Sequence, residues 1–145
     1  MELKIKKLHP NAILPTYGSA GAAGADLYAL PEGDPIVIAP GETVMIHTGL
    51  SMAIPEGYVG LNFARSGLAS KRGLAPANKV GVIDADYRGE VCVILVNLSN
   101  EPFTITDGER IAQMVIARHE QVEWCECEVL DETDRGAGGF GHTGV

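Results

Sequence analysis

The chain has 145 residues, a formal net charge of -8 and a hydrophobic fraction of 46%. This length is enough for one domain with a buried core and excludes two ordinary domains. The negative charge disfavours a nucleic-acid polymer as partner, because duplex affinity depends on Lys and Arg side chains that neutralise phosphates. No apolar run reaches the roughly 20 residues of a membrane-spanning helix, so we expect no membrane partner.

The cysteine content predicts a reducing compartment. Cys92, Cys125 and Cys127 are too few, and odd in number, for a disulfide framework. Cys125 and Cys127 form a C-x-C pair that lacks the second ligand pair of a zinc site. The N-terminal residues have no apolar stretch typical of a secretory signal. We therefore expect free thiols and a cytoplasmic protein.

Short apolar segments, each closed by Gly, Pro, Asn or Asp, recur along the chain. The predicted strands are residues 35–39, 43–50, 58–63, 79–83, 90–98 and 103–106. Their spacing of roughly 8–12 residues is typical of a β-sandwich or β-barrel. Residues 66–73 form a short helical candidate, and residues 109–118 fit a helical stripe as well as a buried strand. The pattern predicts an all-β fold.

Two segments carry candidate residues for binding phosphate or metal. The Gly-rich segment 18–28 matches neither a P-loop nor a dinucleotide-binding pattern, yet it contains the isolated acid Asp26. Arg65, Ser66 and Gly67 are consecutive, and at the start of a short helix they would suit an anion. Either segment taken alone is also compatible with an ordinary turn.

Residues 81–90 predict a β-hairpin with two acids in its turn. The first strand ends at Asp84 and Asp86, and Tyr87 follows before the second strand. Two acids at i and i+2 share a face if the segment is extended, which favours a general base, although both residues are also common in turns. His9, His47 and His119 lie apart in the sequence and show no metal-ligand spacing, and no protein nucleophile is evident. Any hydrolysis would therefore use water.

The last residues, 135–145, form a Gly-rich arm. Five of them are glycine, so the segment contributes little to a core and should be mobile until a ligand orders it. The arm also contains Arg135 and Phe140, which a merely frayed terminus has no need of. We expect a domain of residues 1–134 followed by this arm.

Five segments, in this order, resemble the five motifs of the trimeric deoxyuridine triphosphatase (dUTPase) family. They are residues 23–28, 64–69, 81–89, 108–114 and 135–144, and they extend over nearly the whole chain. Each motif alone is modest, but five in order form a specific signal. The resemblance implies a jelly-roll-like β-barrel in which residues 109–118 form a strand. It also implies a homotrimer with shared active sites, in which the arm of one chain closes over a neighbour's site.

The resemblance assigns a role to each matched residue. Asp84 would orient and deprotonate the attacking water, and Asp26 would hold Mg²⁺, the implied cofactor, through water. Arg65, Ser66, Gly67 and Gln113 would bind the triphosphate; Asn78, Cys92 and the backbone of Gly81, Val82, Ile83 and Asp84 would bind uracil; Tyr87 would contact the deoxyribose; Arg135 would bind the γ-phosphate; and Phe140 and Gly141 would close over the base.

The implied activity is the hydrolysis of dUTP to dUMP and pyrophosphate by attack of water on the α-phosphorus. It would keep uracil out of DNA and supply dUMP for thymidylate synthesis. One alternative is a dCTP deaminase or its bifunctional variant, which the 84–87 sequence and Phe140 oppose. Another is a nucleotide sensor or partner-binding module without catalysis, which the complete set of candidate residues opposes.

One position departs from many relatives, which carry Ser where this chain has His142. A protonated imidazole binds phosphate more strongly than a neutral one. We therefore expect substrate affinity to rise as the pH falls toward about 6. A binding titration in which His142→Ser keeps the same pH dependence would exclude this role.

Overall fold

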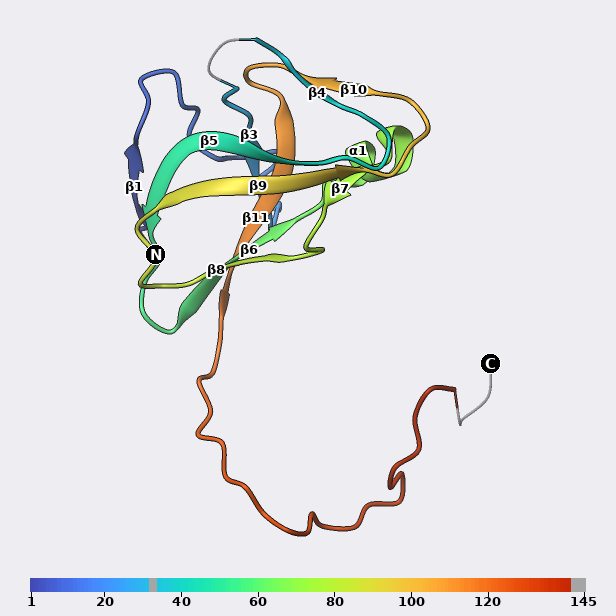
Figure 1. The fold of residues 1–145 in the computed structure, drawn as a ribbon. Coiled ribbons are helices and arrows are strands. Elements are labelled where there is room, and N and C mark those ends of the chain that lie inside the picture. The colour runs from blue at the N-terminus through green and yellow to red at the C-terminus, as the bar shows by residue number, and fades with distance from the viewer. Residues whose placement is uncertain (32–33, 142–145) are drawn as a thin grey trace.

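Antiparallel strands make up most of the secondary structure in the computed structural model, which describes residues 1–31 and 34–141 (Figure 1). One sheet has the order β2 (Thr16–Tyr17), β3 (Ala25–Tyr28), β11 (Arg110–Arg118), β6 (Tyr58–Phe63) and β8 (Gly81–Ile83). The other has the order β1 (Lys4–Lys7), β5 (Thr43–Ala53), β9 (Glu90–Asn97) and β7 (Leu74–Pro76). A short ribbon pairs β10 (Phe103–Ile105) with β4 (Ile36–Ile38). The all-β, jelly-roll-like prediction is confirmed.

The core lies between the two larger sheets and follows the two-residue period of their strands. In β9 the buried residues alternate as Val91, Val93 and Leu95, each no more than 2% exposed. Leu27 from β3 and Ile111 from β11 lie in the same buried cluster, so both sheets contribute to it. This shared core fixes the position of every strand that carries a candidate residue.

The ambiguous segment 109–118 is a strand, because β11 occupies the middle of the five-stranded sheet. The short helical candidate is confirmed as α1 (Ser66–Arg72), which ends at Gly73 in the left-handed conformation with φ +66°. The strand predicted at 79–83 begins only at Gly81, since Lys79 has φ +66°. The predicted strands did not include β1, β2, β3 or β7.

The predicted β-hairpin over residues 81–90 is wrong in its pairing. Strand β8 pairs with β6, whereas β9 pairs with β5 and β7, so β8 and β9 belong to different sheets. Residues 84–89, named the crossover loop here, pass from one sheet to the other. A sequence pattern of strand, turn and strand cannot distinguish this crossover from a hairpin, because the local residues are the same.

A β-bulge interrupts the pairing of β5 with β9 between His47 and Ser51. At its centre Gly49 has φ +68°, a conformation that side-chain-bearing residues rarely adopt. A Cβ atom at this position would lie 2.5 Å from Cδ2 of Leu30 and 2.9 Å from Cβ of Ala12. The bulge therefore requires glycine both for its backbone conformation and for its packing.

We expect Gly49→Ala to lower the free energy of unfolding by about 2–6 kcal/mol, the sum of left-handed strain and overpacking. Urea unfolding at one protein concentration measures the change. Gly41→Ala is the matched control, because Gly41 has φ +77° but no atom within 4 Å of its added Cβ. Equal losses in the two variants would show that packing around Gly49 contributes nothing.

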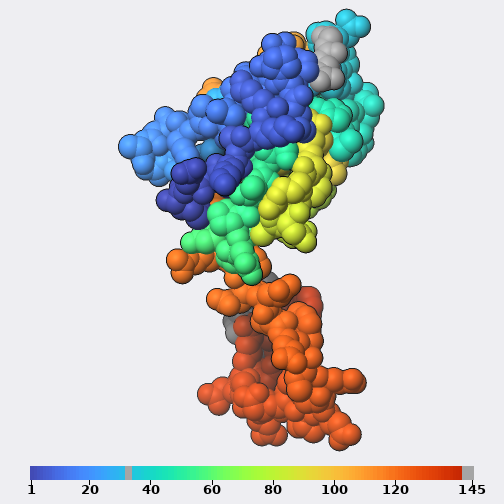
Figure 2. Space-filling model, turned by 90° about the vertical axis from the view of Figure 1, so that its left-hand side faces the viewer, coloured from blue at the N-terminus to red at the C-terminus, as the bar shows by residue number. Residues whose placement is uncertain are grey.

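The chain beyond β11 runs away from the sheets (Figures 1 and 2). Residues 119–137 are exposed, and Trp124 is 90% exposed. Among the described residues, no helix is long and apolar enough to cross a membrane. The body of strands thus ends at Arg118, and the described part of the arm is reached through an extended connection.

Candidate active site

Three motifs that are distant in the sequence meet on the five-stranded sheet. Gln113 on β11 pairs with Asp26 on β3 on one side and with Phe63 on β6 on the other. The chain leaves β6 directly into Arg65. The segments 23–28, 64–69 and 108–114 therefore come together because β11 lies between β3 and β6.

The carboxylate of Asp26 is the centre of this group. Its Oδ1 atom accepts a hydrogen bond from Nε of Arg65 at 2.8 Å, and its Oδ2 atom lies 3.4 Å from Nη1 of Arg110. The Asp26 side chain is 13% exposed, whereas those of Arg65 and Arg110 are 24% and 53% exposed. Two guanidinium groups around one carboxylate leave net positive charge, which suits a polyanion.

Gln113 holds the turn that leads into Arg65. Its Nε2 atom donates a hydrogen bond to the carbonyl oxygen of Ala64 at 2.9 Å. Gly24 makes room for this side chain, since a Cβ atom there would lie 2.8 Å from Oε1 of Gln113. The amide thus positions the backbone just before Arg65.

Ser66 and Gly67 begin α1, with Arg65 as the N-cap residue. Arg65 has extended backbone angles, φ -86° and ψ 128°, and no side chain caps the helix. A cavity of about 300 Å³ lies beside this turn and is lined in part by Arg65, Leu68 and Arg110. A Cβ atom on Gly67 would meet nothing within 4 Å. The start of α1 is therefore open on the side of Gly67.

The crossover loop holds Asp84 and Tyr87 in a compact turn. The N–H group of Tyr87 donates to the carbonyl oxygen of Asp84 at 3.2 Å, so residues 84–86 form a turn and are not extended. The hydroxyl of Tyr87 donates to the carbonyl oxygen of Glu90 at 2.9 Å. Gly89 is necessary for this arrangement, because a Cβ atom there would clash with the hydroxyl oxygen and the ring of Tyr87. Asp84 is exposed at the surface.

Asn78 lies in the turn between β7 and β8. Its carbonyl oxygen accepts a hydrogen bond from the N–H group of Val80 at 2.8 Å. Its Nδ2 atom lies 3.5 Å from where a Cβ atom of Gly81 would be. Strand β8, with Gly81, Val82 and Ile83, is an edge strand, so one side of its backbone has no neighbouring strand among the described residues.

Cys92 lies on β9 directly opposite His47 on β5. Burial, together with the nearby Glu90 carboxylate, raises the pKa of the Cys92 thiol to about 11. Burial acts to raise the pKa of Glu90 too, but hydrogen bonds from His47 and from the N–H group of Gly49 outweigh it, so that pKa is lowered. The thiol is therefore held as a neutral group beside an ionised carboxylate.

Within one chain, the structure does not bring Asp84 to the Asp26 group. Ile83 pairs with Gly60, whereas Gln113 pairs with Phe63, so Asp84 and Arg65 lie toward opposite ends of β6. The three residue steps between Gly60 and Phe63 alone span about 10 Å. The candidate base and the candidate phosphate ligands are thus two separate groups in the single chain.

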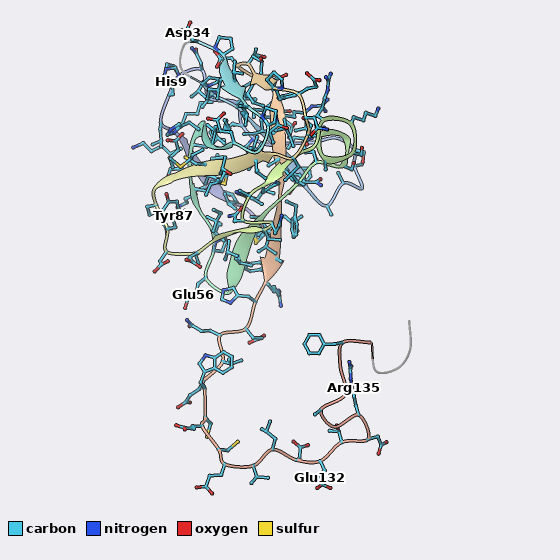
Figure 3. All side chains as sticks on the ribbon, turned by 45° about the vertical axis from the view of Figure 1, so that its right-hand side comes forward. His9, Asp34, Glu56, Tyr87, Glu132 and Arg135 are labelled. Carbon is cyan, nitrogen blue, oxygen red and sulfur yellow. The ribbon has the colours of Figure 1, made fainter. Side chains whose placement is uncertain are left out.

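The described part of the arm lies apart from both groups. Figure 3 shows Arg135 well away from Tyr87. The Nε atom of Arg135 donates to the carbonyl oxygen of Gly138 at 2.8 Å, and the ring of Phe140 is fully exposed. Phe140 and Gly141 have φ of +50° and +90°. His142 lies outside the described residues.

Sequence reasoning missed two residues of these groups. Arg110 contacts Asp26. A register shift in β11 between Arg110 and Ala112 means that a two-residue period does not predict the face of the sheet on which the Arg110 side chain lies. Asn62 is 3% exposed, pairs with Gly81, and its Oδ1 atom has no hydrogen-bond partner among the described residues. A polar residue in the otherwise apolar pattern of 58–63 was the available signal for Asn62.

The sheets and the Asp26 group define a class: an all-β protein in which two guanidinium groups converge on one carboxylate. The family model described as dUTPase matches residues 10–144. Two proteins called deoxyuridine 5'-triphosphate nucleotidohydrolase are similar over almost their whole length. That of Wolinella succinogenes is 51% identical, covering 99% of this chain and 95% of its own, and that of Syntrophotalea carbinolica is 50% identical, covering 98% and 96%.

Solved structures agree with these relatives. A point mutant of the Staphylococcus bacteriophage 80alpha dUTPase with dUpNHpp is 31% identical, with a TM-score of 0.88 and 99% of each chain covered. A mutant dUTPase from phage phi11 of S. aureus, described with a structural Mg(II) ion, is 26% identical, with a TM-score of 0.82 and 91% of this chain and 100% of its own covered. The chain belongs to the dUTPase family.

Proposed function

We propose that the chain hydrolyses dUTP to dUMP and pyrophosphate by attack of water on the α-phosphorus. The observation that carries this proposal is the convergence of Asp26, Arg65 and Gln113 in a chain about half identical to deoxyuridine 5'-triphosphate nucleotidohydrolases. The reaction keeps uracil out of DNA and supplies dUMP for thymidylate synthesis. We also propose that the protein is cytoplasmic, which its three free cysteines, Cys92, Cys125 and Cys127, support.

The deciding assay measures pyrophosphate release from dUTP, dCTP, dTTP and UTP, each with and without Mg²⁺. We expect release from dUTP to be far faster than release from the other three nucleotides, and to require the metal. Ammonia release from dCTP would show that the chain is a deaminase instead. If no nucleotide reacts, the chain is a nucleotide sensor or partner-binding module without catalysis.

The triphosphate binds between Arg65, Ser66, Gly67 and Gln113. The guanidinium of Arg65 donates to Asp26 through Nε, so its two Nη groups are the donors that bind phosphate oxygens. Arg110 contacts the other oxygen of Asp26. The site thus binds the substrate without breaking the ion pair between Asp26 and Arg65.

The residues present fit Mg²⁺. This ion keeps several of its waters and is usually held by one or two carboxylates together with phosphates, so the single carboxylate of Asp26 is enough when contact is made through water. When bound, Mg²⁺ supplies positive charge that offsets the charge of the triphosphate. Asp26 is suited to this role because the guanidinium groups of Arg65 and Arg110 contact its two carboxylate oxygens and so fix the orientation of the carboxylate.

The uracil end binds along the edge strand β8. The backbone of Gly81, Val82, Ile83 and Asp84 offers fixed N–H and C=O groups on its unpaired side, and Asn78 lies beside it. Cys92 lies on β9 in the other sheet and contributes a contact to the base through its backbone. Cytosine presents a different donor and acceptor pattern, so each unmatched backbone group costs about 1–3 kcal/mol. Reading the base with backbone groups therefore provides discrimination without a charged side chain.

Tyr87 packs on the deoxyribose, where a 2'-hydroxyl would clash. We expect Gly89→Ala to displace its ring and to lower kcat/KM for dUTP by about 10–100-fold, because small misplacements near the reacting atoms carry large costs. The ratio of kcat/KM for dUTP to that for UTP should fall as well. Gly18→Ala is the control, since an added Cβ there meets nothing within 4 Å. An unchanged ratio in Gly89→Ala would contradict the role of Tyr87.

The active form of the protein is a homotrimer in which two or more chains contribute residues to each active site. Asp84 and the Asp26 group lie toward opposite ends of β6. The candidate base and the phosphate-binding residues therefore meet only if the crossover loop of one subunit faces the Asp26 group of another. The exposed connection after Arg118 supports an arm, residues 135–145, that reaches a neighbouring subunit. There Arg135 binds the γ-phosphate, and Phe140 and Gly141 cover the base and exclude bulk water.

A further inference from the structure

Three side chains with metal-ligating atoms gather on the outer face of the four-stranded sheet, away from the Asp26 group. His47 on β5 lies opposite Cys92 on β9, and Glu90 precedes Cys92 by two residues, so all three share one face. The Nδ1 atom of His47 lies 2.8 Å from Oε2 of Glu90 and 3.6 Å from Sγ of Cys92. Among residues 1–31 and 34–141 this is the one group of three such side chains, with all ligand atoms within 4.8 Å of one another.

The bulge in β5 orients the carboxylate of this group. The N–H group of Gly49, at the centre of the bulge, donates to Oε1 of Glu90 at 2.7 Å. The other oxygen, Oε2, is then directed at His47. Hydrogen bonds of this kind, which hold a ligating side chain from behind, are typical of metal sites. The His47 side chain is 50% exposed, so the group is open to solvent.

We propose that Nδ1 of His47, Oε2 of Glu90 and Sγ of Cys92 bind a transition-metal ion of the Zn²⁺ type. In a tetrahedral zinc site, the usual bond lengths place sulfur and nitrogen ligands about 3.6 Å apart, which is the separation of Cys92 and His47. Nitrogen and oxygen ligands lie about 3.4 Å apart in such a site. His47 and Glu90 must therefore separate by about half an ångström when the ion replaces their shared proton.

The donor set excludes Mg²⁺ as the preferred ion. A thiolate and an imidazole favour Zn²⁺, Co²⁺ and similar ions, whereas Mg²⁺ requires oxygen ligands in an octahedral arrangement. On binding, the Cys92 thiol releases its proton to solvent and its sulfur donates an electron pair to the ion; no oxidation state changes. With three protein ligands, the fourth position remains open to water.

The proposed metal site adjoins the end of the crossover loop at which β9 begins. The carbonyl oxygen of Glu90 accepts the hydrogen bond of the Tyr87 hydroxyl, and Ser51, which pairs with Glu90, donates through Oγ to the carbonyl oxygen of Arg88 at 2.7 Å. An ion held by His47 on β5 and by Glu90 and Cys92 on β9 therefore fastens β5 to the strand that leaves this loop. Because the ion binds the folded chain, it should also raise the melting temperature.

The test uses the full-length chain, freed of metal by a chelator and then titrated with Co²⁺ as the probe. A thiolate ligand gives a sulfur-to-cobalt charge-transfer band in the near ultraviolet, and calorimetry with Zn²⁺ gives the affinity and the number of ions. We expect one ion per chain, the band, and a rise in melting temperature. Cys92→Ser should lose the band, and His47→Gln, at an exposed position, should weaken binding by at least about tenfold.

The matched control is the double variant Cys125→Ser/Cys127→Ser, which removes the other thiols, both exposed in the segment after β11. It should keep the band, the number of ions and the rate of dUTP hydrolysis. A band that persists in Cys92→Ser and disappears in the double variant would place the ion on the C-x-C pair and overturn the proposal. Absence of Zn²⁺ binding at micromolar concentration would overturn it too.

Discussion

Asp84→Asn is expected to lower kcat for dUTP hydrolysis by about 10²–10⁴-fold, the usual contribution of a positioned general base. The amide keeps the size of the carboxylate and the turn with Tyr87, which uses only the backbone oxygen of Asp84. The substitution removes the proton acceptor while leaving the uracil-binding backbone in place. Pyrophosphate release measures the rate, and binding of a non-hydrolysable dUTP analogue should change by less than about threefold if only the transition state loses an interaction.

Asp86→Asn is the matched control, because Asp86 is an exposed acid in the same crossover loop. It should retain nearly all of the activity. If the two variants lose activity equally, the loss reflects the charge of the loop and not a base at Asp84. Near wild-type turnover in Asp84→Asn would remove Asp84 from the mechanism altogether.

The parts of the fold that sequence predicts well are those with a clear local signal. Turn residues between apolar segments mark β5, β6 and β9. In β6 and β9 burial also alternates with a two-residue period, whereas residues 48–52 of β5 are all buried. Strand β2, with only two residues, is too short to show a period. Strands β3 and β7 lie in segments of Gly, Ala and Pro, whose extended conformation comes from pairing and not from propensity.

Pairing itself is a long-range property, and this explains the errors at the sites. The 81–90 pattern predicts two strands joined by a turn but not that they enter different sheets. Asp26, Arg65 and Gln113 were found as separate motifs, and only the position of β11 between β3 and β6 shows that they meet. His47 shows no metal-ligand spacing in the sequence, since its partners are 43 and 45 residues away on β9.

Mixing two inactive variants should restore activity if the sites are shared. Arg65→Ala removes a charged donor to phosphate and should lower kcat/KM by about 10²–10³-fold. Asp84→Asn chains retain Arg65, and Arg65→Ala chains retain Asp84. When equal amounts are unfolded together and refolded, about one quarter of the sites should combine both intact residues from two different chains. Pyrophosphate release from the mixture should then reach about one quarter of the wild-type rate.

A second mixture separates shared sites from sites within one chain. When the double variant Asp84→Asn/Arg65→Ala is refolded with an equal amount of wild type, shared sites again give about one quarter of full activity, whereas single-chain sites give about one half. Copurification of tagged with untagged chains verifies that the subunits have mixed. If mixing is verified and the first mixture stays inactive, one chain holds a whole site. The crossover loop must then move toward the Asp26 group, against the pairing of β8 with β6 that now holds Asp84 toward the opposite end of the strand.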